Sequence, residues 1–527
     1  MNFKALGKIL GKIMILEGAL MLAPLLVSII YNEPLRYKLS YVFPILALAI
    51  IGFLLQLPKP KRASLYQKEG FALVAMVWLV ITLFGAIPFV ISKDIPNYID
   101  AWFEIMSGFT TTGSSIISDI TAVSHSTLFW RSFSHWIGGM GILVFVLIFI
   151  PESNDGSSMH LLRAESPGPQ VGKIVSKMKV TTRILYLIYL GMTALQIIIM
   201  CCGPLIDYNA VSDALGSEVA DAYQKNKVFY ALLSSFGCAG TGGFGFIPNS
   251  IQYFTPFAQY VMAIFLILFG CNFSLYYLIL IGKAKQIFKS EELKSYFLIV
   301  GVAVTLIFIS LVGKLGAFPQ TYTTEEAFRH SLFQVASLIT TAGYSTTDFN
   351  VWPMLARTML IVIMFIGAMA GSTAGGMKMS RIVIAAKGAY INVRKLINPR
   401  YVPKAKFEGK TLEEKTISDV FTFITLYFFI FLAAIFLLSF DPVNGSVIQI
   451  VSDAGSYDVT HGFFSNFSAA LTCISNVGPA FEAVGPYASF AGYSAFSKIV
   501  LTLTMMLGRL EILPVFILFN PRTWKRT

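Results

Sequence analysis

Four short stretches of this sequence share one pattern: a small or polar residue, one intervening residue and then a glycine. The stretches are Thr111-Thr112-Gly113, Gly240-Thr241-Gly242, Thr341-Ala342-Gly343 and Asn476-Val477-Gly478. Glycine permits backbone angles that other residues avoid, so it lets a chain turn its carbonyl oxygens inward. Rings of backbone carbonyls can replace the hydration shell of a monovalent cation. The four stretches together predict a cation-coordinating ring made of backbone.

A short run of helical character precedes each stretch. These runs cover about 101–109, 227–238, 324–338 and 462–474. A helix of about ten residues is too short to cross a bilayer, but it can enter and return where irregular backbone lines a water-filled cavity. Its C-terminal end carries a partial negative charge, which favours a cation nearby. We therefore expect four re-entrant helices around one pore.

Each short run lies between two long apolar segments, so one unit repeats four times: outer helix, re-entrant helix, glycine stretch and inner helix. The outer helices are expected at about 71–92, 184–204, 295–316 and 416–440. The inner helices are expected at about 127–150, 254–281, 353–383 and 494–518. Two further helices, 9–31 and 42–57, come first, and no cleavable signal peptide is evident before them.

The composition agrees with this plan. Of 527 residues 55% are apolar and 13% are charged, and runs long enough to span a bilayer recur along the chain. The fold class is an all-α integral membrane protein with two N-terminal helices and four pseudo-repeats around one pore. The expected divisions are 1–70 (N-terminal helices and cytoplasmic link), 71–150 (repeat 1), 151–294 (cytoplasmic loop and repeat 2), 295–383 (repeat 3) and 384–527 (cytoplasmic loop and repeat 4).

The net charge of +12 is distributed unevenly. Lysines and arginines gather in four loops and the C-terminal tail, and excess Lys and Arg marks the cytoplasmic side. Both termini are then cytoplasmic, and the glycine stretches are approached from an acidic outer face that concentrates cations. For any single outer acid, a solvated loop residue is the simpler reading. This placement of charge argues against nucleic acid as a partner.

Other residue types give little sign of chemistry. The five cysteines lie in or beside apolar segments without metal-ligand spacing, which is typical of buried thiols. The five histidines also lack metal spacing. A multi-pass membrane enzyme would need an intramembrane constellation of acid, His or Ser, and no nucleophile–base arrangement or phosphate-binding loop is recognisable. We expect no enzyme activity and no bound cofactor.

Two features mark the third and fourth inner helices. The first is a run of small residues: Gly367, Gly371, Ser372, Thr373, Gly375 and Gly376. Such a run is unfavourable inside a helix and indicates an interruption, although close helix packing is the alternative. The second is Arg509, because an intramembrane arginine usually faces the bundle interior or a cavity. Its alternative is a salt bridge to Glu511 or another acid, although helix positions two apart, such as Arg509 and Glu511, do not face each other.

Several longer motifs resemble the Trk/Ktr/HKT superfamily of potassium transporters, and most closely its bacterial TrkH type. They are "DAWFEIMSGFTTTGSS" followed by "LFWRSFSHWIGGMGILV", then "LLRAESPGP", "TGGFG", "FGCNFSLYYL", "FQVASLITTAGYSTTDF", "GAMAGSTAGGMKMSRI", "SNVGPAF" and "MMLGRLEILPVFILFNPRTW". The motifs span nearly the whole chain in family order, and the two extra N-terminal helices also favour the TrkH type.

The resemblance implies that K⁺ is the transported ion. It implies a selectivity filter in which Thr112, Thr241, Ala342 and Val477 precede the filter glycines Gly113, Gly242, Gly343 and Gly478, flanked by Thr111 and Asn476. It further implies that 367–376 forms an intramembrane loop that gates the pore, and that Arg509 lies near the ion path below the filter, where its charge raises a barrier to cations. Glu104 is expected to support the filter by hydrogen bonds, and Asn272 to bond across helices.

The resemblance also implies partners and a location. These are a homodimer, a cytosolic RCK-type nucleotide-binding regulatory subunit, membrane lipid and the bacterial inner membrane. The basic segment 384–415 is a docking surface for that subunit or ordinary cytoplasmic charge, and Lys378 and Arg381 either steer the gate or mark the membrane boundary. Unequal filter stretches leave K⁺ over Na⁺ selectivity open. A K⁺/H⁺ or K⁺/Na⁺ symporter and a less selective monovalent cation channel remain alternatives.

Overall fold

The computed structural model describes residues 2–58, 67–141, 178–313, 322–398, 405–452, 455–512 and 514–516. The basic link around Lys61, the loop with the motif "LLRAESPGP" and the basic tail after 516 therefore lie outside the described residues.

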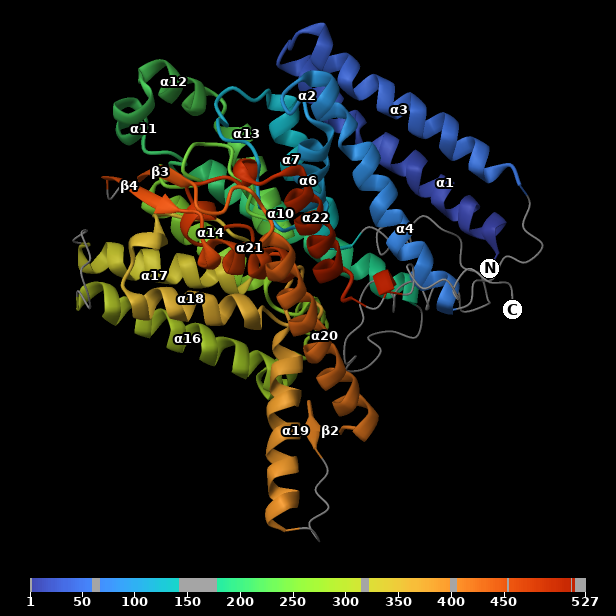
Figure 1. Cartoon of the computed structure of the whole chain (residues 1–527), viewed down its shortest axis with the longest axis vertical. Helices are drawn as coiled ribbons and strands as arrows, with labels where there is room; N and C mark the ends of the chain where they lie inside the picture. The colour runs from blue at the N-terminus through green and yellow to red at the C-terminus, as the bar shows by residue number, and fades with distance from the viewer. Residues whose placement is uncertain are drawn as a thin grey trace.

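The two predicted N-terminal spans lie to one side of the molecule (Figure 1). The first is formed by α1 (Phe3–Leu20) and α2 (Leu22–Ile30), which only Met21 separates, and the second is α3 (Leu35–Gln56). Helices α1 and α3 approach each other at a pair of glycines. A Cβ atom on Gly11 would lie 2.4 Å from the carbonyl oxygen of Gly52, and one on Gly52 would lie 2.7 Å from that of Gly11. Small residues allow such close backbone packing between membrane helices.

The four repeats follow with the expected elements. Their outer helices are α4 (Gln67–Gly85), α10 (Met178–Cys202), α16 (Glu291–Val312) and α20 (Glu414–Leu438). Their short pore helices are α6 (Tyr98–Phe109), α13 (Lys227–Gly240), α17 (Thr324–Ile339) and α21 (Phe463–Ser475). Their inner helices begin with α7 (His125–Gly139), α14 (Pro256–Phe269), α18 (Met354–Ile366) and α22 (Ala495–Arg509). The pore helices agree with the sequence prediction to within three residues at either end.

The pore helices are joined into a closed ring by the inner helices. Each pore helix packs against the inner helix of its own repeat and against that of the preceding repeat: α6 against α7 and α22, α13 against α14 and α7, α17 against α18 and α14, and α21 against α22 and α18. The fourth repeat thus returns to the first. The predicted fold class, four pseudo-repeats around one axis, is confirmed.

The chain is a multi-pass membrane protein. Among the described residues, six helices are long and apolar enough to span a bilayer, or seven when α14 and α15 (Phe273–Leu280) count as one bent span. Their surfaces are extensively exposed, and only 22% of the apolar window of α10 is buried within the chain. Exposed apolar helix faces of this kind are accommodated by lipid.

The inner helices are shorter than the sequence predicts. Within the described residues they end after 15, 14, 13 and 15 residues, at Gly139, Phe269, Ile366 and Arg509. The prediction of continuous helices to 281 and 518 is wrong: α14 and α15 meet at an angle of 91°, and Glu511 and Ile512 after α22 have positive φ. The apolar pattern continues across both breaks, so periodicity alone does not reveal them. Residues 142–150 of the first lie outside the described residues.

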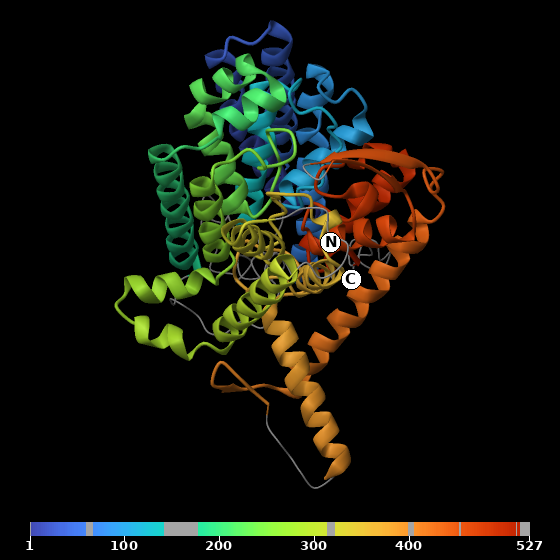
Figure 2. The same ribbon diagram turned by 90° about the vertical axis from the view of Figure 1, so that its left-hand side faces the viewer.

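Smaller elements connect the repeats. They are α5 (Ile87–Ser92), α11 (Tyr208–Leu215), α12 (Ser217–Lys225), the 3₁₀ turns η1 (Ala284–Lys289), η2 (Phe349–Val351), η3 (Glu482–Val484) and η4 (Phe490–Gly492), and the antiparallel pairs β1 (Lys406–Phe407) with β2 (Lys410–Thr411) and β3 (Val447–Ser452) with β4 (Gly455–Thr460). Helix α19 (Met379–Ile397) projects beyond the rest of the chain, with the β1–β2 hairpin beside it (Figures 1 and 2).

Candidate functional site

All four pore helices end in the same turn. The residue after each helix, or one later, adopts the left-handed conformation, with φ between 54° and 58°: Thr111, Thr241, Thr341 and Asn476. The next residue then donates its N–H to a carbonyl five residues earlier, at 2.8–2.9 Å: Thr112 to Ser107, Gly242 to Gly237, Ala342 to Ser337 and Val477 to Thr472. This hydrogen-bond pattern is that of a Schellman motif, which closes a helix and redirects the chain.

The residue types in this turn are unfavourable for its geometry. Asparagine tolerates the left-handed region, but a β-branched threonine is an outlier there. Three of the four positions nevertheless carry threonine. Strained residues of this kind cost about 1–3 kcal/mol each, and they cluster at functional sites. The turn is therefore maintained by its surroundings and not by local preference.

The turn also fixes the register of the four stretches. Two residues after each left-handed residue comes a glycine with positive φ: Gly113 (84°), Gly243 (72°), Gly343 (81°) and Gly478 (108°). The three-residue sequence pattern paired Gly242 with Gly113, and the backbone geometry shifts this pairing by one residue. Gly242 is the counterpart of Thr112, and Gly243 that of Gly113. The second stretch contains three glycines, so the pattern fits it twice and only the hydrogen-bonded turn decides between the two.

These glycines interlock around the axis. A Cβ atom on Gly113 would lie 2.0 Å from the carbonyl oxygen of Gly242, and one on Gly243 would lie 1.7 Å from that of Ala342. A Cβ on Gly343 would lie 2.1 Å from the oxygen of Val477, and one on Gly478 would lie 2.6 Å from that of Thr112. Each glycine thus faces a carbonyl of the next repeat, and the last faces the first. We call these four glycines and four carbonyls the carbonyl ring.

The carbonyl ring opens onto one cavity of about 620 Å³. Its lining includes Gly113, Gly243, Gly343 and Gly478, together with residues of β3 and of the segment 483–493. Gly113 and its three counterparts therefore share a single space. These four cavity-lining glycines, Gly243 among them, are the same four that have positive φ two residues after the left-handed position.

Two of the left-handed residues carry a buried side-chain oxygen without a hydrogen-bond partner in the described part of the chain. Thr111 Oγ1 and Asn476 Oδ1 are buried and have no hydrogen-bond partner among the described residues. The Nδ2 group of Asn476 donates to Thr112 Oγ1 at 2.9 Å and to the Met505 carbonyl at 3.0 Å. Asn476 Oδ1 faces α22, because a Cβ atom on Gly508 would lie 2.8 Å from it.

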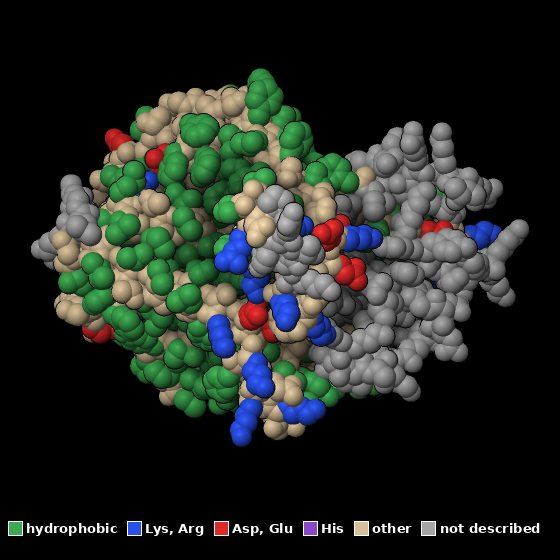
Figure 3. All heavy atoms as spheres, turned by 90° about the horizontal axis from the view of Figure 1, so that it is seen from below, with side chains coloured by type: hydrophobic (Ala, Val, Ile, Leu, Met, Phe, Trp, Pro, Cys, Tyr) green, Lys and Arg blue, Asp and Glu red, His purple; other side chains and the backbone are tan. Residues whose placement is uncertain are grey.

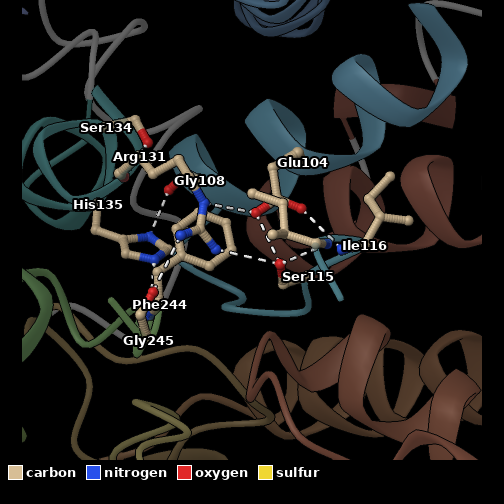
Figure 4. Close-up of polar contacts among 10 residues, drawn as sticks. Glu104, Gly108, Ser115, Ile116, Arg131, Ser134, His135, Phe244 and Gly245 are labelled. Atoms are coloured by element: carbon tan, nitrogen blue, oxygen red, sulfur yellow. Dashed lines mark hydrogen bonds and ion pairs between the residues drawn. The ribbon is translucent and has the colours of Figure 1, made fainter. Parts of the chain in front are cut away.

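A buried ion pair supports the first stretch from behind (Figure 4). Glu104 of α6 accepts from Arg131 Nε at 2.7 Å and from Ser115 Oγ at 3.0 Å, and its second oxygen accepts from the Ile116 N–H at 2.9 Å. Both charged side chains are at most 2% exposed. Arg131 also donates to the Gly245 carbonyl at 3.0 Å, which connects the second repeat. The prediction that Glu104 supports this region by hydrogen bonds is confirmed.

His135, one helical turn beyond Arg131 on α7, ties the first two repeats together (Figure 4). Its Nδ1 lies 2.8 Å from the Gly108 carbonyl, and its Nε2 lies 3.3 Å from the Phe244 N–H. The carbonyl requires a proton on Nδ1, so Nε2 is the acceptor. Sequence reasoning dismissed this histidine as a metal ligand and missed its role. The available signal was the i, i+4 spacing from Arg131, which places both on one face of α7.

Residues 367–378 form a non-helical loop between α18 and α19, which we call the intramembrane loop. Gly367, Gly371, Gly376 and Lys378 all have positive φ, between 72° and 75°. The Gly375 N–H donates to Thr341 Oγ1 at 2.7 Å, and a Cβ on Gly375 would lie 2.5 Å from the Ser475 carbonyl. The run of small residues thus forms a loop against the inner end of the ring and not a helix-packing face.

Arg509 bridges this loop and the first inner helix. Its Nη1 donates to the Thr373 carbonyl at 3.1 Å, and its Nη2 donates to the carbonyls of Gly139, at 3.0 Å, and Gly138. Glu511, the alternative partner, forms an ion pair with Arg381. The side chain of Lys378 donates to the Ala374 carbonyl within the loop.

Asn272 differs from its expected role. Its Oδ1 accepts from the Ser274 N–H at 2.8 Å and so caps α15 at the break after α14, in place of the expected bond across helices. The intramembrane loop lies next to this cap, because the Phe273 N–H donates to the Gly371 carbonyl at 3.0 Å.

Comparison with known proteins places this geometry in context. The model of the TrkH family, described as cation transport protein, matches residues 42–526. The chain is 31% identical over 530 residues to the Trk system potassium uptake protein TrkH of Escherichia coli K12, and each chain is covered completely. It is 28% identical over 511 residues to TrkG of the same strain, with 96% of this chain and 95% of the relative covered.

A solved structure agrees over the whole length. The crystal structure of the potassium transporter TrkH from Vibrio parahaemolyticus superimposes with a TM-score of 0.79 at 27% sequence identity, and the match covers 100% of both chains.

Proposed function

The chain belongs to the TrkH family of cation transport proteins, and from that premise we propose that it takes up potassium through the carbonyl ring. The observation that carries this proposal is the closed interlock of four glycines with four carbonyls of neighbouring repeats. Curated relatives that match over their whole length are named as potassium uptake proteins, which supports K⁺ as the ion.

The filter is assigned to the four stretches in the register of the turn. Its members are Thr111, Thr112, Gly113, Thr241, Gly242, Gly243, Ala342, Gly343, Asn476, Val477 and Gly478. The carbonyls of Thr112, Gly242, Ala342 and Val477 replace water around the ion. The negative ends of the four pore helices stabilise its charge.

The intramembrane loop is assigned as the gate. It lies against Thr341 and Ser475, at the inner end of the filter, so a cation leaving the filter meets it next. Arg509 holds the loop to α7 and adds a positive charge there, and a fixed charge in a region of low dielectric constant opposes a passing cation strongly. Release of this loop opens the path.

The protein is assigned to a bacterial inner membrane with both termini in the cytoplasm. Helix α19, whose last turn carries Arg394 and Lys395, lies at the end of the molecule opposite the acid-bearing α11 and α12 (Figure 1), which supports this orientation.

A homodimer and an RCK-type regulatory subunit complete the proposed system. Seen from below, Lys and Arg side chains gather where α19 projects toward the viewer, beside a broad area of hydrophobic side chains (Figure 3). On α19 the exposed Leu396 (83%) and Ile397 (79%) follow Arg394 and Lys395. This end of α19 is suited to bind a partner.

Radioactive rubidium uptake into liposomes that contain the purified chain tests the proposal. We expect uptake that K⁺ suppresses at lower concentration than Na⁺. Absence of uptake by correctly inserted protein would refute the proposal. Reversal potentials measured with H⁺ and Na⁺ gradients imposed separately distinguish a channel from a symporter, because only coupled transport shifts them.

A further inference from the structure

A buried acid at the N-terminus of α16 contacts both sides of the intramembrane loop. Glu292 is only 5% exposed. Its Oε1 accepts from the Ala370 N–H at 2.7 Å and from the Ser380 N–H at 3.1 Å. Ala370 belongs to the loop, and Ser380 belongs to the first turn of α19. One carboxylate oxygen therefore joins the middle of the loop to the helix that follows it.

Neither N–H donor has a backbone acceptor within a helix of its own. Ala370 lies outside any helix, and the first N–H groups of α19 have no carbonyl within their own helix. Glu292 is thus well suited to fix the loop in the position seen.

The cytoplasmic hairpin β1–β2 supports Glu292 in turn. Glu408, in the turn of this hairpin, accepts through Oε1 from Ser290 Oγ and from the Glu292 N–H, both at 2.9 Å. Glu408 and Gly409 both have positive φ (49° and 73°), as a tight two-residue hairpin turn requires. The hairpin thereby caps the first turn of α16, the turn that carries Glu292.

The hairpin is itself anchored to the neighbouring helices. Phe407 is 2% exposed and packs with Ile384 of α19 and Val420 of α20. Lys387 of α19 forms an ion pair with Glu291 and donates to the Lys406 carbonyl at 2.7 Å. A force on the hairpin or on α19 therefore reaches the N-terminus of α16.

We propose that Glu292 is the positioning residue of the intramembrane loop, and that the hairpin carrying Glu408 controls it. Displacing the hairpin from α16 removes the cap, frees Glu292 to move and lets the loop leave the inner end of the filter. This inference rests on the proposed function, in which the loop obstructs the cation path.

Rubidium efflux from liposomes provides the first test. Glu292→Ala removes the acceptor of both hydrogen bonds and should raise efflux about tenfold. Glu292→Gln retains an oxygen acceptor and should raise it less. Lys294→Ala, an exposed change in the same turn of α16, is the control and should leave efflux unchanged.

Amide hydrogen exchange separates positioning from general destabilisation. In Glu292→Ala, exchange at Ala370 and Ser380 should accelerate, whereas the filter amides of Thr112 and Ala342 should keep their protection. Faster exchange throughout the four repeats would instead indicate loss of structure and would contradict the proposal. Should the alanine variant fail to insert, Glu292→Gln and Glu408→Ala carry the same test.

A double-mutant cycle tests the role of the hairpin. Glu408→Ala should raise efflux, and the double variant Glu292→Ala/Glu408→Ala should not exceed Glu292→Ala alone, because both act through one contact. Additive effects, or unchanged efflux in Glu292→Ala, would overturn the inference.

The same data keep the two proposals apart. If the unaltered chain carries rubidium and Gly375→Ala changes the flux while the Glu292 variants do not, the gate stands and the role of Glu292 fails. If the unaltered chain carries no rubidium, the proposed function itself fails.

Discussion

At the scale of single residues, the pore depends on positions where a side chain cannot be accommodated. Gly243 has a φ of 72°, and any Cβ on it would overlap the carbonyl oxygen of Ala342. A Cβ atom on Gly113, Gly343 or Gly478 would likewise overlap a carbonyl oxygen of a neighbouring repeat. Residues larger than glycine therefore do not fit at these four positions.

The first prediction tests the corrected register. Gly243→Ala should reduce rubidium uptake more than tenfold, because the new methyl group displaces a carbonyl of the neighbouring repeat. Gly245→Ala is the matched control: its nearest contact would be an ordinary 3.5 Å, and its φ is not positive. Growth of an uptake-deficient strain on limiting K⁺ measures both. Normal growth with Gly243→Ala would show that Gly243 lies outside the ring.

The second prediction concerns the ion pair behind the first filter stretch. Glu104→Ala leaves Arg131 buried without its partner and should lower stability by about 3–5 kcal/mol. Glu104→Leu combined with Arg131→Met should recover part of that loss, because two apolar groups replace two charges. Thermal unfolding in detergent measures both changes. Equal destabilisation by the single and double variants would contradict this account.

At the scale of elements, the sequence predicts the parts that follow a period and misses those fixed by tertiary contacts. The bounds of α6, α13, α17 and α21 follow from apolar periodicity and a terminal glycine pattern. The break between α14 and α15 does not, because Gly270 and Asn272 lie in an apolar run that reads as one span. Asn272 then caps the second half, a role that only the break explains.

The same distinction applies within the site. Glu104 and Arg509 could be singled out because charges inside a membrane protein require a reason. The register of the second stretch could not, since Gly240, Gly242 and Gly243 satisfy the pattern in two ways. His135 could not be assigned either, since its acceptor on α6 and its donor after the second filter stretch come together only in the fold.

The third prediction concerns the contact between two elements, the intramembrane loop and α22. Arg509→Ala removes hydrogen bonds to the carbonyls of Thr373, Gly138 and Gly139 together with a positive charge. Rubidium flux should rise several-fold. Arg509→Lys keeps the charge but loses the planar fork of donors. Its flux should lie between that of the unaltered chain and that of Arg509→Ala. Single-channel or liposome flux measurements decide this, and a lower flux in Arg509→Ala would contradict a barrier at this position.

At the scale of the whole molecule, the pore is a ring whose first and last members are remote in sequence. The ring closes where α22 packs against α6, and there Lys498 Nζ donates to Asp100 Oδ1 at 2.8 Å across 398 positions of sequence. The intramembrane loop, α16 and the β1–β2 hairpin form one connected path from the surface to the carbonyl ring. The carbonyl ring and the segments proposed to control it thus come from different layers of the same repeats.

The most direct test of the central claim is anomalous diffraction from crystals of the chain soaked with thallous or rubidium ions. The account predicts a peak on the axis of the ring, about 3 Å from the carbonyl oxygens of Thr112, Gly242, Ala342 and Val477. The peak should vanish in Gly243→Ala. A heavy cation bound elsewhere, with the ring empty at saturating concentration, would contradict a carbonyl filter at this place.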